Sequence, residues 1–175
     1  MNKEQLQEAT IHKLLEAQHE NSELENKLEQ IWQELTTKLE NLGFTYKPRS
    51  DWKEYKHLGD FVTEPIEIKN GVTRHVEVDA FFALPSFPTW YYYLGAQINK
   101  VEVSTNTENR YGLKTDGYEV KEEVRQAHLS FSGETDEIVC KGNTVDEFIA
   151  IVKKVVSEIG SDKFKSDTMI IDDNI

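Results

Sequence analysis

The first 42 residues contain neither glycine nor proline, and this constrains the fold more than any other feature of the chain. They are rich in Glu, Gln, Lys and Leu, which are good helix formers. Gly43 then stands just past the predicted helix end, a position that glycine favours. We therefore predict a helix over residues 3–42.

The apolar residues of this segment repeat with heptad spacing, which is typical of a coiled coil. Asn21 falls within the seam, and a polar residue there favours one register and a parallel dimer. We expect the helix to support a homodimer. The residues predicted to carry oligomerisation are Leu14, Asn21, Leu24, Leu28, Ile31 and Leu35.

An alternative for the same segment stays open. Ser22-Glu23-Leu24-Glu25 has the pattern of a capping box, which would split the segment into helices over about 3–20 and 23–42. From residue 28 onward, Trp32 and Leu39 widen the apolar stripe, which then suits packing on a globular body. We favour one long helix, kinked near Asn21, with its N-terminal half free to pair.

Residues 43–160 are predicted to form the globular domain. Turn signals such as Asn70-Gly71 alternate with β-branched and aromatic runs, which indicates antiparallel strands. The pattern of residues 118–126 fits a helix or a strand, and both stay open. We expect an α+β fold with an antiparallel sheet of four to six strands. The predicted strands lie near 61–68, 72–83, 90–104 and 127–140.

The end of this domain is predicted to be an amphipathic helix. Thr144-Val145-Asp146-Glu147 is a capping box, and a broad apolar face follows it as far as Gly160. Residues 161–175 are predicted to be a flexible acidic tail. The chain is thus divided into a helical segment 1–42, a domain 43–160 and a tail 161–175.

Charge and composition limit the classes of function. The net charge of −12 disfavours direct binding of nucleic acid, whose affinity comes from Lys and Arg on phosphates, and favours a basic partner. With one cysteine, no long apolar run and no leader pattern, we expect a cytoplasmic protein that does not enter a membrane.

The stretch Glu67-x-Lys69 has the spacing of a metal-dependent nuclease, but a hairpin explains it better. A three-residue loop, Lys69-Asn70-Gly71 with Gly71 left-handed, puts Ile66 opposite Arg74 and the neighbouring apolar residues on one face. Lys69 then lies in the turn at the solvent edge. We therefore predict no catalytic residue, no metal site and no cofactor. The alternative is a divergent Mg²⁺-dependent nuclease that uses Asp60, Glu67, Asp79 or Glu102.

Residues 81–95 hold the densest group of aromatic side chains in the sequence. On a strand, Tyr91 and Tyr93 would face away from the core face. Tyr and Trp are enriched at binding hot spots, so we place a partner-binding surface at Trp90, Tyr91 and Tyr93.

These features together favour a small acidic, non-catalytic binding protein. We expect it to dock on a protein partner, in the manner of an inhibitor or immunity-type factor that occupies a basic nucleic-acid-binding surface. A third possibility is a structural subunit that only oligomerises. Deletion of residues 1–27 would then abolish assembly and leave a folded monomer.

Overall fold

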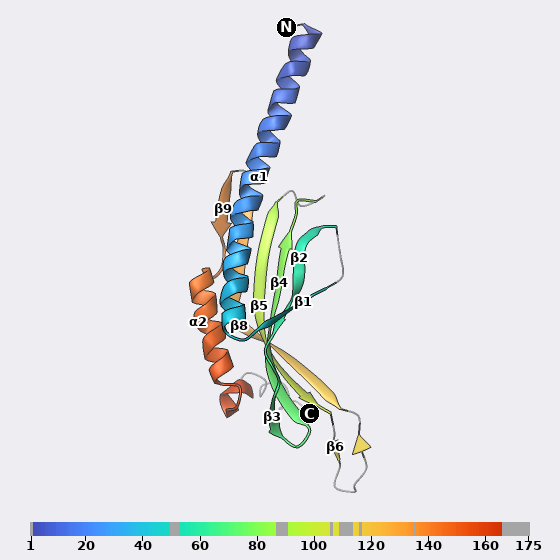
Figure 1. Cartoon of the computed structure of the whole chain (residues 1–175), viewed down its shortest axis with the longest axis vertical. Helices are drawn as coiled ribbons and strands as arrows, with labels where there is room; N and C mark the ends of the chain where they lie inside the picture. Colours follow the sequence, from blue (N-terminus) through green and yellow to red (C-terminus); the bar gives the residue numbers. More distant parts are fainter. Residues whose placement is uncertain are drawn as a thin grey trace, which may run out of the picture.

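The computed structural model has the α+β fold expected from the sequence, with helices packed on an antiparallel sheet (Figure 1). It describes residues 2–49, 53–86, 91–105, 107–108, 114–115, 117–134 and 136–165. For residues 13–22, 107–108, 114–115 and 165 it describes only the backbone.

Helix α1 (Lys3–Asn41) is continuous over 39 residues. Asn2 caps its start, because its side chain accepts a hydrogen bond from the backbone N–H of Gln5. Gly43, with a φ of 92°, follows its end. The helix passes through the Ser22 capping sequence without a break, so the two-helix alternative is wrong. From Leu24 onward, side chains of the helix are buried against the sheet, and this burial stabilises one continuous helix where the local capping sequence would start a second one.

The main sheet has seven strands, more than the four to six expected. Its order is β1-β2-β4-β5-β8-β9, and β3 pairs with the first residues of β4. Strands β6 and β7 form a separate two-stranded ribbon. The strands are β1 (Thr45–Pro48), β2 (Tyr55–Val62), β3 (Ile66–Lys69), β4 (Val72–Ala83), β5 (Tyr92–Ser104), β6 (Thr107–Glu108), β7 (Lys114–Thr115), β8 (Tyr118–Glu134) and β9 (Glu137–Cys140).

The strand count differs because β1 was not predicted and because two predicted strands are each two strands. The segment 61–68 is interrupted before Pro65, which has no N–H to donate to a ladder, so β2 ends at Val62 and β3 begins at Ile66. The segment 127–140 reverses between Glu134 and Glu137. The ambiguous residues 118–126 are strand: they are the first part of β8, paired along β5.

The hairpin between β3 and β4 differs from the prediction: its loop is only Asn70-Gly71, because Lys69 is the last residue of β3 and pairs with Val72. Gly71 is left-handed, with a φ of 73°, and Ile66 lies opposite Arg74. The register shifts after Glu67, so Lys69 rather than Ile68 is opposite Val72. Ile66 is 40% exposed, because this hairpin extends to the end of the sheet away from the N-terminus (Figure 1).

Helix α2 (Val145–Ser157) starts at the predicted cap. Thr144 Oγ1 accepts from the backbone N–H of Glu147 at 3.2 Å. The apolar side chains that follow are buried against the sheet. The chain continues into a 3₁₀ turn, η1 (Asp162–Lys165), whose Phe164 is 2% exposed. The start of the predicted flexible tail is therefore packed on the domain, and residues 166–175 lie outside the described residues.

Both helices cover the same face of the sheet (Figure 1). Side chains of β4 alternate between buried and half-buried along its whole length, which is the pattern of a sheet with one covered face. Apolar area removed from water on the covered face supplies the main stabilisation of the fold. Within the described residues, none of the helices is long and apolar enough to cross a membrane.

A ring stack and a set of hydrogen bonds join α1 to strand β2 at the edge of this core. The ring of Trp32 stacks on that of His57, with centroids 4.8 Å apart and planes 9° apart. His57 Nε2 lies 2.8 Å from Glu29 Oε2, and Gln33 donates to Glu29 Oε1 at 3.1 Å. Burial alone would raise the pKa of Glu29, but the hydrogen bonds from Gln33 and His57 and the charge of Lys56 lower it below its ordinary 4.5.

Glu29→Gln should lower the free energy of unfolding by about 1 kcal/mol at pH 7. A carboxyl whose pKa is lower in the folded state stabilises the fold above its unfolded pKa, and this contribution is lost as the pH falls through the folded value. The difference between wild type and variant should therefore shrink as the pH falls below 4.5. Urea unfolding between pH 7 and pH 3 measures it, with the exposed Glu8→Gln as control. A difference that stays constant over this range would contradict the role of the Glu29 charge.

Candidate functional site

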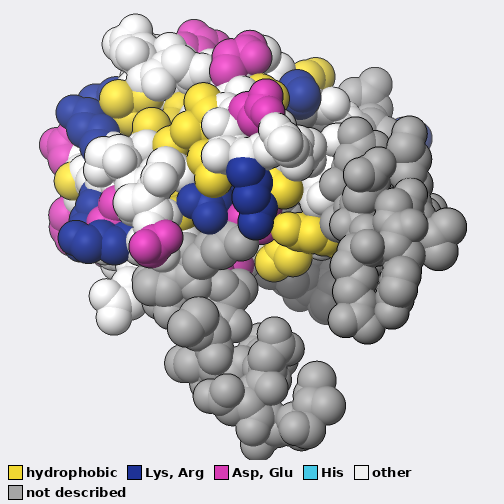
Figure 2. All heavy atoms as spheres, turned by 90° about the horizontal axis from the view of Figure 1, so that it is seen from below, with side chains coloured by type: hydrophobic (Ala, Val, Ile, Leu, Met, Phe, Trp, Pro, Cys, Tyr) yellow, Lys and Arg dark blue, Asp and Glu magenta, His cyan; other side chains and the backbone are white. Residues whose placement is uncertain are grey.

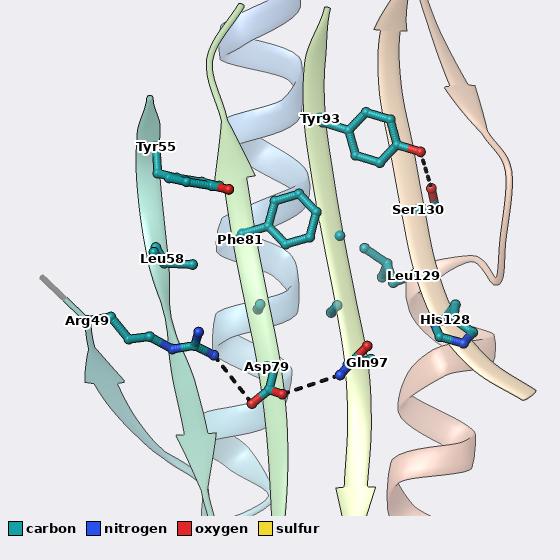
Figure 3. Close-up of a pocket in the computed structure, with 13 residues that line it drawn as sticks. Arg49, Tyr55, Leu58, Asp79, Phe81, Tyr93, Gln97, His128, Leu129 and Ser130 are labelled. Carbon is teal, nitrogen blue, oxygen red and sulfur yellow. Dashed lines mark hydrogen bonds and ion pairs between the residues drawn. The ribbon is translucent and has the colours of Figure 1, made fainter. Parts of the chain in front are cut away.

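The second face of the sheet is not covered by any described helix or strand. It carries the half-buried side chains of β4 and β5 and is hollowed into an open groove of about 620 Å³. The groove has an aromatic end and an ionic end (Figure 3). We refer to it as the open-face groove.

Tyr55, Phe81 and Tyr93 form the aromatic end, one residue from each of three adjacent strands. The rings of Phe81 and Tyr93 are stacked, with centroids 6.2 Å apart, and Tyr55 meets Phe81 edge-on at 6.1 Å. Gly95 lies opposite Phe81, and a Cβ there would come within 2.7 Å of the ring. The absence of a side chain at Gly95 therefore lets the Phe81 ring lie over the sheet backbone. Ser130 Oγ donates to the Tyr93 hydroxyl at 3.3 Å.

Arg49 and Asp79 line the ionic end, and Asp60 on β2 lies directly opposite Asp79 on β4. Arg49 holds Asp60 through two hydrogen bonds, at 2.6 and 3.2 Å, and its Nη2 lies 3.6 Å from Asp79 Oδ1. Asn99 Nδ2 donates to Asp79 Oδ2 at 2.7 Å, and Lys121 Nζ is 3.3 Å from the same oxygen. Asp79 is therefore surrounded by donors from three segments: the end of β1, β5 and β8.

The network continues along β4 to Glu77. Lys121 Nζ lies 2.8 Å from Glu77 Oε2, and His75 Nε2 lies 3.1 Å from Glu77 Oε1. Burial alone would raise the pKa of Glu77, but the hydrogen bonds from Lys121 and His75 lower it. Burial likewise would lower the pKa of Lys121, and its pairing with Glu77 and Asp79 raises it.

The two opposed aspartates have pKa values that move apart. Burial and the adjacent Asp60 carboxyl raise the pKa of Asp79 above its ordinary 3.8, and Lys121 opposes this rise. Burial would also raise the pKa of Asp60, but the hydrogen bonds from Arg49 and with Asp79 lower it. Two carboxyls so close cannot both be charged without cost, and the one with fewer direct guanidinium bonds holds its proton longer.

Asp60→Asn should lower the pKa of Asp79, because it removes the like charge that disfavours the Asp79 carboxylate. A pH titration of the Asp side-chain carboxyl ¹³C resonances measures this shift. The pKa of Asp146, which Lys38 holds below its ordinary value on α2, should stay unchanged. An Asp79 pKa that is unaltered or higher in the variant would show that the Asp60 carboxyl does not raise it.

The structure places two of the three predicted partner-binding residues on the open face. Tyr93 lines the open-face groove, and Tyr91, two residues earlier on the same side of the chain, is 47% exposed. Tyr92, between them, is buried on the helix side, as the predicted alternation requires. Trp90 lies outside the described residues.

Of the four acids considered for a nuclease, the structure brings only Asp60 and Asp79 together. Asp79 lines the ionic end of the open-face groove, and Asp60 lies opposite it on β2. Glu102 lies on the covered face, where it is buried and bound to Arg74 at 2.9 Å. Glu67 is exposed on β3, next to the hairpin loop. Among the residues that the structure describes, no group of three or more His, Cys, Asp or Glu side chains could hold a metal ion.

The residues predicted to oligomerise divide along α1. Leu24, Leu28 and Leu35 are at most 3% exposed and belong to the core between α1 and the sheet, and Ile31 packs against that core. Their heptad spacing is therefore accounted for by contacts within one chain. Leu14 and Asn21 are on the part of α1 where only the backbone is described, and dimerisation through them stays a prediction.

Sequence reasoning missed Arg49, Tyr55 and Phe81 as parts of a site. Phe81 had a signal, since it lies in the aromatic-rich stretch and alternates with the core residues Ala80 and Phe82. Arg49 and Tyr55 had no signal of comparable strength, because the position of Tyr55 depends on how β2 pairs with β4 and that of Arg49 on how β1 pairs with β2.

Searches against known protein families, curated proteins and solved structures returned no match for this chain. The functional assignment therefore depends on the geometry of the open face.

The acidic residues do not form one continuous patch on the described part of the end that Figure 2 shows. Figure 2 shows the end of the molecule away from the N-terminus, where hydrophobic, basic and acidic side chains are intermixed on the described part. On the open face, by contrast, the opposed carboxylates of Asp60 and Asp79 lie beside an aromatic cluster. The combination, rather than the net charge of the chain, distinguishes this surface.

Proposed function

We propose that this is a non-catalytic binding protein that docks on the basic surface of a protein partner through the open face of its sheet. The observation that carries this proposal is the open-face groove, in which a half-buried aromatic cluster lies beside a pair of opposed aspartates. Aromatic side chains on a surface are typical of binding hot spots, and a surrounding set of charges selects the partner. An inhibitor or immunity-type role, with a basic nucleic-acid-binding surface as the target, fits the net charge of −12.

Affinity capture from the native cell tests this function. The full-length protein is used as bait at low and at high salt, with the Tyr93→Ala/Phe81→Ala variant as the matched bait. We expect one near-stoichiometric partner that the wild-type bait captures and the variant does not. Loss of this partner at high salt would show that the affinity comes mainly from the charged side chains of the ionic end. Retention at high salt would show that it comes mainly from the aromatic end. No partner at either salt, or equal capture by both baits, would contradict docking through the open face.

The alternative of a divergent nuclease is favoured by one observation, the juxtaposition of Asp60 and Asp79. Two converging carboxylates are the minimum for a divalent ion at a phosphodiester. Arg49 and Lys121 already neutralise them, so a metal ion would have to displace these cations. Incubation of the protein with DNA or RNA and Mg²⁺ decides this, because the binding function predicts no cleavage by either wild type or Asp79→Ala.

The structural-subunit alternative concerns the N-terminal half of α1, which extends beyond the sheet (Figure 1). Leu6 and Ile11 are more than half exposed there. Deletion of residues 2–20 tests this role more cleanly than deletion of 1–27, because the buried Leu24 stays in place. If the helix serves only to assemble copies, the shortened protein will be a folded monomer that has lost all function; under the binding proposal it still captures the partner.

A further inference from the structure

The two ends of the open-face groove offer different chemistry to one ligand. The faces and edges of Phe81, Tyr93 and Tyr55 form the aromatic end. The faces of such rings carry partial negative charge and attract cations. At the ionic end, Asp79 presents a carboxylate that is 18% exposed and therefore reachable from the groove (Figure 3).

The spacing of the two ends matches one long side chain. Phe81 and Asp79 are two residues apart on β4 and point to the same side, so roughly 7 Å separates their positions along the strand. An extended arginine side chain has about this length. Its methylene groups could lie along the ring of Phe81 while its guanidinium reaches Asp79, and a guanidinium can also stack on an aromatic face.

The local charge balance leaves room for a further cation. The side chains of Asp60, Glu77 and Asp79 carry three carboxylates on the groove side of the sheet. Among the described residues, the permanently charged cations that contact them are Arg49 and Lys121, one fewer than the carboxylates. His75 contacts Glu77, and His128, which lines the other wall, is paired with Glu123 at 2.9 Å. Arg49 and Lys121 are 46% and 40% exposed, so both can shift to admit a third positive group.

We propose that the open-face groove takes an arginine side chain from the surface of the partner protein, with the guanidinium on Asp79 and the side-chain methylenes on Phe81. The inference rests on the proposed function and adds to it the chemistry of the central contact. Arginine is preferred to lysine, because its planar fork binds a carboxylate through two parallel hydrogen bonds and its weaker hydration eases transfer onto an aromatic surface.

An NMR titration of the ¹⁵N-labelled full-length protein tests the inference without knowledge of the partner. The probe is the tripeptide Gly-Arg-Gly, acetylated and amidated so that no terminal charge remains. The matched probes carry lysine, or citrulline, which has nearly the shape of arginine but no charge. We expect Gly-Arg-Gly to shift the amide resonances of residues 79–81 and 93–97, with about tenfold weaker binding of the citrulline peptide.

Two substitutions separate the two ends of the groove. Asp79→Asn should weaken Gly-Arg-Gly binding about tenfold, and Phe81→Leu, which keeps an apolar side chain but removes the ring, about threefold. Asp146→Asn removes an exposed carboxylate of α2 and should leave binding unchanged. Each variant's spectrum away from the groove reports whether it is folded.

The inference is overturned if the citrulline peptide binds as tightly as the arginine peptide, if shifts map outside the groove, or if none appear at tens of millimolar peptide. Its failure is distinct from failure of the proposed function. A captured partner whose binding is unaffected by Asp79→Asn would leave the function standing and remove the arginine contact. Specific binding of Gly-Arg-Gly, with no partner captured from the cell, would support the arginine contact and contradict the proposed function.

Discussion

Leu35→Ala is expected to lower the free energy of unfolding by about 3 kcal/mol and to leave the oligomeric state unchanged. Leu35 is 0% exposed and packs within the core between α1 and the sheet. Truncation of a buried leucine removes its transfer free energy and leaves a cavity that the surroundings fill only in part. Urea unfolding followed by circular dichroism measures the loss, and sedimentation velocity measures the oligomeric state.

Leu6→Ala serves as the matched control, since Leu6 is 54% exposed on the same helix. It should change the free energy of unfolding by less than about 0.5 kcal/mol. The opposite result, in which Leu35→Ala dissociates an oligomer but leaves a monomer of full stability, would show that the heptad leucines pack between chains and not within one chain.

The heptad pattern shows where sequence reasoning reaches its limit in this protein. Leucines such as Leu28 and Leu35 repeat with the same spacing whether they face a partner helix or a sheet of the same chain. The broader stripe that includes Trp32 pointed to the sheet, and the structure agrees from Leu24 onward. Spacing alone could not distinguish a partner helix from the sheet of the same chain, because either one buries the same apolar face of the helix.

The open face was predictable in part. Alternation at the start of β5 was enough to place Tyr93 on the face opposite to that of the core residues Tyr92 and Leu94. The pair Asp60 and Asp79 could not be found in the same way, because their contact depends on the pairing register of β2 with β4. The predicted strand near 61–68 began after Asp60, so that acid was assigned to no strand.

The second large effect is expected at the buried ion pair of the covered face. Arg74 Nε donates to Glu102 Oε2 at 2.9 Å, and Tyr118 donates to Glu102 Oε1 at 3.0 Å. Arg74 also donates to the backbone carbonyls of Ile159 and Ser161, just beyond α2, and lies under the ring of Phe164. The pair therefore connects the long strands to the end of the helical layer.

Glu102→Gln should lower the free energy of unfolding by about 3 kcal/mol, although the side chain keeps its size. The variant leaves the Arg74 guanidinium buried without its counter-charge, and an unpaired buried charge is far more costly than a missing surface pair. Thermal and urea unfolding of wild type and variant measure the loss. Glu34→Gln, which removes a carboxylate from the exposed pair with Lys38, should cost less than about 0.5 kcal/mol.

The double variant Arg74→Met/Glu102→Leu separates loss of charge pairing from loss of packing. It removes both charges and keeps similar volume, so it should be more stable than Glu102→Gln alone. The carbonyls of Ile159 and Ser161 lose their donor in this variant, so its free energy of unfolding should stay below that of the wild type. The η1 turn, which follows these carbonyls, should be less well ordered. A double variant less stable than the single one would mean that these carbonyl bonds, and not the neutralised charge of Arg74, carry most of the stabilisation at this site.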